Sequence, residues 1–243
     1  MLRYCLAVAL LASAPSHAPA AVPMHAPAKI IADARQAESD ASVEELVKKL
    51  KDKNRNVVSE AIGSLLKIGA RAAPFLERFA EQEKEVAPRL DALNVLIEID
   101  PERPSVVPAL LKLAKGRGFF DSEETLLARR AAGMSLARTS AGIRALPALL
   151  KDEDVFVRRS AAFALDDPTE VLDELSAPQR AAIREVLPAL VGALDDEDDV
   201  VRGMSCEVLG QIVRSRVAPL NAAAEKLLKE RGKSRGRCLC ECD

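Results

Sequence analysis

The chain contains few of the residues from which enzymes build catalytic centres. Its 243 residues include no tryptophan, one tyrosine and two histidines, and both histidines, His17 and His25, lie near the N-terminus. A serine or cysteine nucleophile in the rest of the chain would therefore have no histidine base. A glycine-rich phosphate loop is also missing, since Gly116-Arg117-Gly118 is only a short loop with two glycines. We expect no enzymatic activity and no cofactor.

Large side chains and long apolar runs are scarce as well. Aromatic residues make up 3% of the chain, although hydrophobic residues make up 49%. A single compact core would normally contain more aromatic residues, whereas a supply of mostly Ala, Leu and Val suits closely stacked helices. No run approaches about 18 apolar residues, so we expect no stable membrane span. The net charge of -2 gives no general attraction to nucleic acid, which we do not expect as a partner.

The N-terminal residues have the pattern of a secretory signal. Arg3 supplies a positive charge, Leu6 to Ala12 form a short apolar run, and Ala18-Pro19-Ala20 matches the small-x-small pattern of cleavage sites. We therefore predict a signal peptide over residues 1–20 and an Ala/Pro-rich linker over residues 21–41. A disordered Ala/Pro-rich start is the alternative. The prediction implies an exported protein, either periplasmic or secreted.

A short pattern repeats along the chain between about residues 42 and 231. Apolar residues recur there at steps of three and four, which indicates helices, and no stretch alternates as a half-buried strand would. In each unit a basic residue is followed by a small residue three positions later and by a leucine seven positions later. The sets are Arg89, Ala92, Leu96; Arg129, Ala132, Leu136; Arg158, Ala161, Leu165; and Arg202, Ser205, Leu209. Val58, Ala61 and Leu65 form a fifth set that lacks the basic residue.

Two further features recur with this pattern. Pro-Ala-Leu begins at Pro108, Pro147 and Pro188, and because proline is tolerated in the first turn of a helix, each is expected early in a first helix. An acidic residue precedes each set by six positions, where it would lie in the turn between two helices. Such an acid can pair with the arginine of the second helix, within one repeat or between repeats. The predicted structural ladder consists of Glu83, Arg89, Glu123, Arg129, Asp152, Arg158, Asp196 and Arg202.

The repeats predict an all-α fold, an α-solenoid of about five helix pairs. One amphipathic pair cannot cover its own apolar stripe, so it stacks on the next pair. A final helix over residues 217–230 has a polar outer face and would cap the array. The repeat domain then covers residues 42–231, and a basic, cysteine-rich tail follows over residues 232–243. The expected pairs are residues 42–69, 72–99, 104–139, 142–166 and 179–214.

The repeated pattern resembles that of the HEAT-repeat superfamily, especially the short bacterial HEAT-like repeats also found in phycobilisome lyases. Those repeats have Pro-Ala-Leu on the first helix, an acidic turn, and Asp-x-x-Val-Arg-x-x-Ala-x-x-x-Leu on the second helix. Asp154 to Leu165 fits this second pattern fully, and Asp198 to Leu209 fits it with Ser205 in place of alanine. The resemblance implies a solenoid whose second helices line a concave side and which acts as a protein-binding scaffold. It does not imply catalysis.

Outward-facing side chains of the second helices form a candidate contact surface. At about 100° per residue, Phe156, Arg159 and Phe163 point away from the core of the fourth second helix, and Arg130 and Met134 occupy matching positions on the third. Aromatic, methionine and arginine side chains outside a core are typical binding anchors. We therefore predict a partner-binding patch of these five residues. Packing against adjacent repeats is the alternative.

Two charged or thiol-rich segments could bind a metal. The run Asp195 to Asp199 lacks the glycine and spaced ligands of a calcium loop, and we interpret it as an acidic turn before a helix. The tail cysteines Cys238, Cys240 and Cys242 could hold a soft metal, form disulfides, or have no specific role. Cys206 brings the exported chain to four cysteines, which permits two disulfides, but we expect it to be a buried, hydrophobic residue of a helix.

The sequence thus predicts an exported, non-catalytic scaffold that binds a protein partner. Two alternatives remain open. One is a metal- or thiol-handling protein that acts through the cysteine tail. The other is a lyase-like chromophore-binding protein, which would have to bind a tetrapyrrole.

Overall fold

The computed structural model describes residues 39–116, 123–166, 169 and 172–235, and these residues form helices joined by short turns, without a strand. Residues 43–48 are helical and continue into the short helix η1 (Lys49–Lys51). A second short helix, η2 (Gly69–Ala72), joins α2 to α3. The remaining helices are α2 (Arg55–Ile68), α3 (Ala73–Gln82), α4 (Val86–Ile99), α5 (Val106–Ala114), α6 (Glu123–Ala137), α7 (Ser140–Leu149), α8 (Val155–Phe163), α10 (Ala177–Ala193), α11 (Asp199–Arg214) and α12 (Ala218–Arg235). The prediction of an all-α chain is confirmed.

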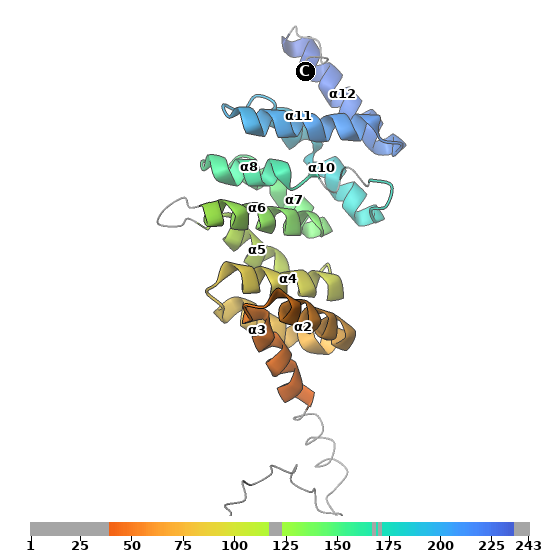
Figure 1. Cartoon of the computed structure of the whole chain (residues 1–243). Helices are drawn as coiled ribbons and strands as arrows, with labels where there is room; N and C mark the ends of the chain where they lie inside the picture. The colour runs from red at the N-terminus through yellow and green to blue at the C-terminus, as the bar shows by residue number, and fades with distance from the viewer. Residues whose placement is uncertain (1–38, 117–122, 167–168, 170–171, 236–243) are drawn as a thin grey trace, which may run out of the picture. The chain divides into compact units, whose positions relative to one another are not determined.

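Successive helices form pairs that stack in order along the chain. Within each pair the second helix packs on the first, as α4 does on α3 and α6 does on α5. The second helices also pack on one another from pair to pair, in the order α2, α4, α6, α8 and α11, and in Figure 1 they lie in one row. Helix α12 packs on both α10 and α11 and ends the stack. The predicted solenoid of five helix pairs with a C-terminal capping helix is therefore confirmed.

The repeated small residue and leucine form the core between the pairs. All ten members of these two columns are buried: Ala61, Leu65, Ala92, Leu96, Ala132, Leu136, Ala161, Leu165, Ser205 and Leu209. The small side chains let neighbouring helices approach closely, while each leucine fills the space between one layer and the next. Truncating a buried leucine of this kind to alanine typically costs about 2–5 kcal/mol. The repeat is therefore a packing pattern that runs the length of the stack.

The expected position of the proline motifs was wrong for two of the three. Pro108 is the third residue of α5, as predicted, but Pro147 and Pro188 lie inside α7 and α10, closer to their ends. These helices begin earlier because Thr139 and Ser176 cap them. The carbonyl oxygens that the two prolines leave without a helical partner lie four residues earlier, at Ile143, which is buried, and at Arg184, which is exposed.

None of the described helices combines the length and the apolar character that crossing a bilayer requires.

Candidate functional site

The acidic residues of the inter-helix turns close those turns and begin the second helices. In three turns an aspartate accepts a hydrogen bond from the backbone amide two residues later: Asp52 from Asn54 (2.8 Å), Asp152 from Asp154 (3.1 Å) and Asp196 from Asp198 (2.9 Å). Each of those later residues is itself the N-cap of a second helix. The acidic residues were predicted to pair with arginines, and this local role was not predicted. Asp-x-Asp and Asp-x-Asn before an apolar run are the signals that could have revealed it.

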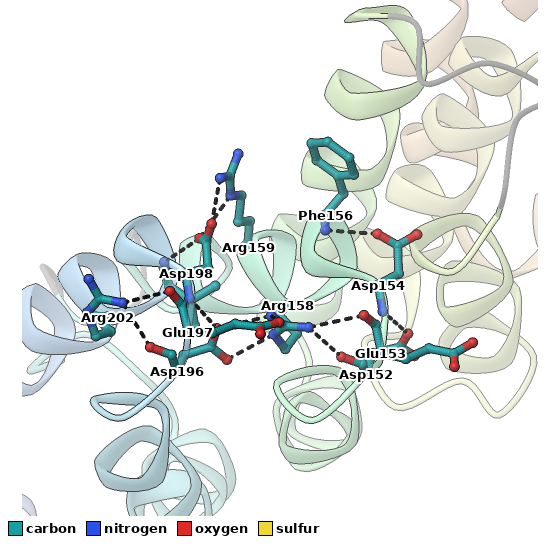
Figure 2. Close-up of polar contacts among 11 residues, drawn as sticks. Asp152, Glu153, Asp154, Phe156, Arg158, Arg159, Asp196, Glu197, Asp198 and Arg202 are labelled. Carbon is teal, nitrogen blue, oxygen red and sulfur yellow. Dashed lines mark hydrogen bonds and ion pairs between the residues drawn. The ribbon is translucent and has the colours of Figure 1, made fainter.

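Arg158 joins the fourth helix pair to the fifth. Figure 2 shows its side chain reaching from α8 to the next turn, where Nε and Nη2 donate to the two carboxylate oxygens of Asp196 at 2.9 and 3.1 Å. Nη1 donates to the carbonyl oxygens of Asp152 and Glu153 in its own turn. The planar guanidinium matches this arrangement of acceptors. The hydrogen bond to Asp196 raises the pKa of Arg158 above its ordinary value.

The other arginines of this column differ in how many turns they connect. Arg129 is almost fully buried and donates to the Gly116 carbonyl (2.9 Å) and to the carboxylate of Asp154 (2.9 Å) in the following turn. Within the described part of the chain, Arg202 donates to two carbonyl oxygens of its own turn and pairs with no carboxylate (Figure 2). The Nε of Arg89 is buried without a hydrogen-bond partner among the described residues.

The acidic members of the predicted ladder have different partners. Lys115 pairs with Asp152 at 3.1 Å. Lys51 pairs with Glu83 at 2.9 Å. Two backbone amides also donate to Glu83, and these bonds together lower the pKa of that carboxyl. The side chain of Glu123 lies outside the described residues.

Four of the five residues of the predicted contact patch form two arginine–aromatic pairs. The guanidinium carbon of Arg130 lies 4.3 Å from the centre of the Phe163 ring, which connects α6 to α8. Arg159 lies 5.6 Å from the centre of the Phe156 ring, one turn away on the same helix. Both phenyl rings are half-buried, so the structure leaves part of each accessible. Cation–π contacts of this kind contribute about 0.5–1 kcal/mol at exposed positions.

Arg159 also has a second, structural partner. Its Nε and Nη2 bind both carboxylate oxygens of Asp198, at 2.9 and 2.6 Å, and Figure 2 shows this pair between α8 and the start of α11. The hydrogen bond from Arg159, together with backbone amides, lowers the pKa of Asp198 from 3.8 to about 2. Arg159 is therefore committed to holding α8 against α11, whereas Arg130 is not tied to an acidic residue of the described chain.

An exposed leucine extends the patch on α6. Leu127 is 60% exposed, the largest exposure of any large hydrophobic side chain among the described residues. It lies three positions before Arg130, so the two occupy the same face of the helix. Leu127 is not one of the five residues predicted for the contact patch. We define the α6–α8 surface as Leu127, Arg130, Met134, Phe156, Arg159 and Phe163.

A groove of about 730 Å³ adjoins the α6–α8 surface. Met134 belongs to both, and Ala131 and Leu90 contribute further apolar lining. Polar residues from α4, α6 and the start of α10 complete it, among them Asn94, Ser135, Arg138 and Gln179. The sequence did not reveal this groove, because its walls come from segments up to about 120 positions apart, from Arg55 to Gln179.

The acidic run at the start of α11 is used within the fold. Asp195 pairs with Arg231 of α12 at 2.8 Å, and Glu197 pairs with Arg158 at 2.9 Å. With Asp196 and Asp198, four of the five residues are thus in ion pairs. No group of three or more His, Cys, Asp or Glu side chains in the described ranges could hold a metal ion.

The cysteines of the tail lie outside the described residues, so their predicted metal or redox role stays a prediction. Cys206 differs from its expectation. It lies half-buried on α11 and is disulfide-bonded, rather than acting as a free, buried hydrophobic residue.

Comparison with known proteins identifies the repeat. Residues 155–212, from the start of α8 to near the end of α11, match the family model described as HEAT-like repeat. No curated protein has a significant sequence match to the chain.

Solved structures with some likeness are helical repeat proteins and engineered proteins. A designed armadillo repeat protein in complex with the peptide (KR)4 is 17% identical, over 82% of this chain and 95% of that one, with a TM-score of 0.42. An engineered protein is 20% identical over 80% and 90%, with a TM-score of 0.40. The E. coli protein YibA is 21% identical over 86% and 71%, with a TM-score of 0.38. Residues 155–212 are therefore similar to HEAT-like repeats, and the described helices before and after them stack in pairs in the same way.

Proposed function

We propose that this chain is an exported, non-catalytic scaffold that binds a protein partner through the α6–α8 surface. Solenoids of helical repeats typically serve as protein-binding scaffolds, because their stacked helices present extended surfaces. The observation that carries the proposal is the exposed Leu127 beside the Arg130–Phe163 stack. Apolar, aromatic and arginine side chains grouped in this way are typical of the residues that dominate binding energy.

The absence of catalysis is supported by the composition of the stack. The two histidines of the chain lie outside the described residues. The polar clusters of the described turns are formed by arginines and carboxylates that satisfy one another, as in the Arg158–Asp196 pair. Such pairs align one repeat with the next.

Export is supported by two independent features. The first is the signal-like pattern of residues 1–20. The second is the disulfide of Cys206, since disulfides persist mainly in oxidising compartments. Cell fractionation of the native host, with the N-terminal mass of the mature chain, tests this part of the proposal.

Site-specific photo-crosslinking in the native host tests the binding surface. A photoreactive phenylalanine analogue replaces Leu127, and a matched control replaces Lys112, which is exposed on α5 in the other row of helices. We expect a discrete cross-linked product from position 127, its loss on adding Arg130→Glu, and no such product from position 112. Equal products from both positions, or a product that Arg130→Glu leaves unchanged, would contradict the proposal.

A further inference from the structure

Arg130 differs from the neighbouring arginines in lacking a carboxylate partner. Arg55 pairs with Asp91 at 3.1 Å, Arg138 pairs with Glu98, and Arg159 pairs with Asp198. Arg130 is exposed, and no acidic side chain of the described residues forms an ion pair with it. Its guanidinium lies over the ring of Phe163. The positive charge of Arg130 is therefore available to pair with an acidic group of a partner.

The contact with Phe163 also restricts the orientation of the Arg130 side chain. The guanidinium carbon of Arg130 lies over the Phe163 ring, 4.3 Å from its centre, and the guanidinium carries five N–H donors. Arginine presents these donors as a rigid fork that fits the two oxygens of a carboxylate. Because the ring already holds the side chain, less rotational freedom is lost when a ligand binds. The arrangement suits an aspartate or glutamate of a partner.

An apolar position lies one helical turn from this carboxylate site. Met134 follows Arg130 by four residues, which is about 6 Å along α6 at 1.5 Å per residue. Met134 and Leu90 line the adjoining groove. Its volume of about 730 Å³ lies within the range of about 300–1,000 Å³ typical of ligand sites. An aliphatic side chain placed here would be buried against both residues.

A hydrogen-bond donor in the groove favours an extended peptide as the occupant. The Oδ1 of Asn94 accepts from Ser135 (2.8 Å) and from Arg138 (3.2 Å), which fixes the orientation of the amide. Its amide nitrogen donates to no other described residue, so it remains available for a ligand. The backbone carbonyls of an extended chain are free to accept such a bond, whereas those in a helix are already used.

We propose that the partner is recognised through an extended segment with an acidic residue two positions from an aliphatic one. Residues i and i+2 of an extended chain point to the same side and lie about 6.6 Å apart, which matches the spacing between Arg130 and Met134. The acidic side chain binds Arg130, the aliphatic side chain enters the groove beside Met134, and Asn94 donates to the backbone. This inference rests on the proposed function and names the chemistry of the partner.

Selection of random heptapeptides displayed on phage against the immobilised full chain tests this inference. We expect enrichment of peptides with Asp or Glu two positions from Leu, Ile, Val or Met. Synthetic copies should bind Arg130→Glu at least ten times more weakly, while Lys112→Glu, on α5, binds as the parent chain does. Selection against Arg130→Glu should instead enrich Lys or Arg at the acidic position.

Three results would overturn the inference: no enriched peptides, enriched peptides without the acidic position, or equal binding to the parent chain and Arg130→Glu. The proposed function can be judged separately. A cross-linked partner from position 127, combined with peptides that lack an acidic residue, would refute the inference about the partner's chemistry and leave the binding surface standing.

Discussion

Replacing Arg158 by alanine is expected to lower the free energy of unfolding by about 3 kcal/mol. The side chain is 8% exposed and makes two bonds to Asp196, one to Glu197 and two to carbonyls of its own turn. Glu197 is 85% exposed, so its bond contributes little. Breaking a buried ion pair on one side typically costs about 3–5 kcal/mol. The lower end applies because Asp196 keeps its bond from the Asp198 amide.

Arg202→Ala is the matched control for this prediction. Arg202 has the same position in the next repeat, but it is exposed, and among the residues that the structure describes it binds two carbonyls of its own turn and no carboxylate. Its loss should cost about 1 kcal/mol or less. Urea unfolding followed by circular dichroism measures both variants, and a double-mutant cycle with Asp196→Asn should give a coupling of about 1–3 kcal/mol for the pair. Equal losses for Arg158→Ala and Arg202→Ala, or a coupling near zero, would refute the view that Arg158 joins two repeats.

Three further perturbations follow from the same contacts. A methyl group at Gly133 would lie 2.8 Å from a backbone oxygen of α8, so Gly133→Ala should lower the free energy of unfolding by about 1–3 kcal/mol. Gly203 has open space around it, so Gly203→Ala should be neutral or stabilising. Equal effects of the two substitutions on the free energy of unfolding would contradict this prediction. Asp198→Asn keeps the helix cap but loses the ion pair with Arg159. Because the pKa of Asp198 is lowered from 3.8 to about 2, its contribution is present above about pH 4 and is lost as the pH falls to 2. At neutral pH the Asp198→Asn variant should therefore be less stable than the parent chain by about 1–2 kcal/mol, after allowance for the partly exposed Arg159. Near pH 2 the two chains should be equally stable. A difference in stability that does not change with pH would contradict this prediction. Deleting residues 238–243 should leave partner capture intact, and its loss would favour the thiol- or metal-handling alternative.

The layered fold could be predicted because it depends on a pattern that repeats. The buried columns of small residues and leucines fall at fixed positions in every unit, and each unit meets the same neighbours. Where the start of a helix depends on a local cap, the repeat was a poorer guide. Pro147 and Pro188 follow the same motif as Pro108, yet caps further upstream place them inside longer helices.

The candidate site could be predicted only in part, because its contacts cross between helices. The helical phase placed Arg130 and Phe163 on one surface, and the structure brings them together 33 positions apart. Phase alone could not show that Arg159 is tied to Asp198 while Arg130 has no acidic partner among the described residues. That distinction depends on which turn lies beside each helix, and the repeated pattern is the same for both.

The two methionines of the described chain provide the most direct test of the α6–α8 surface. Met134 lies at the edge of the groove, whereas Met204 lies on α11, outside the proposed surface, and both are half-buried. With ¹³C-labelled methionine methyl groups, NMR spectra can follow both residues as the cross-linked partner is added in purified form. The account predicts that the Met134 signal shifts or broadens with partner concentration while the Met204 signal stays unchanged. A complex that forms without any change at Met134 would contradict it.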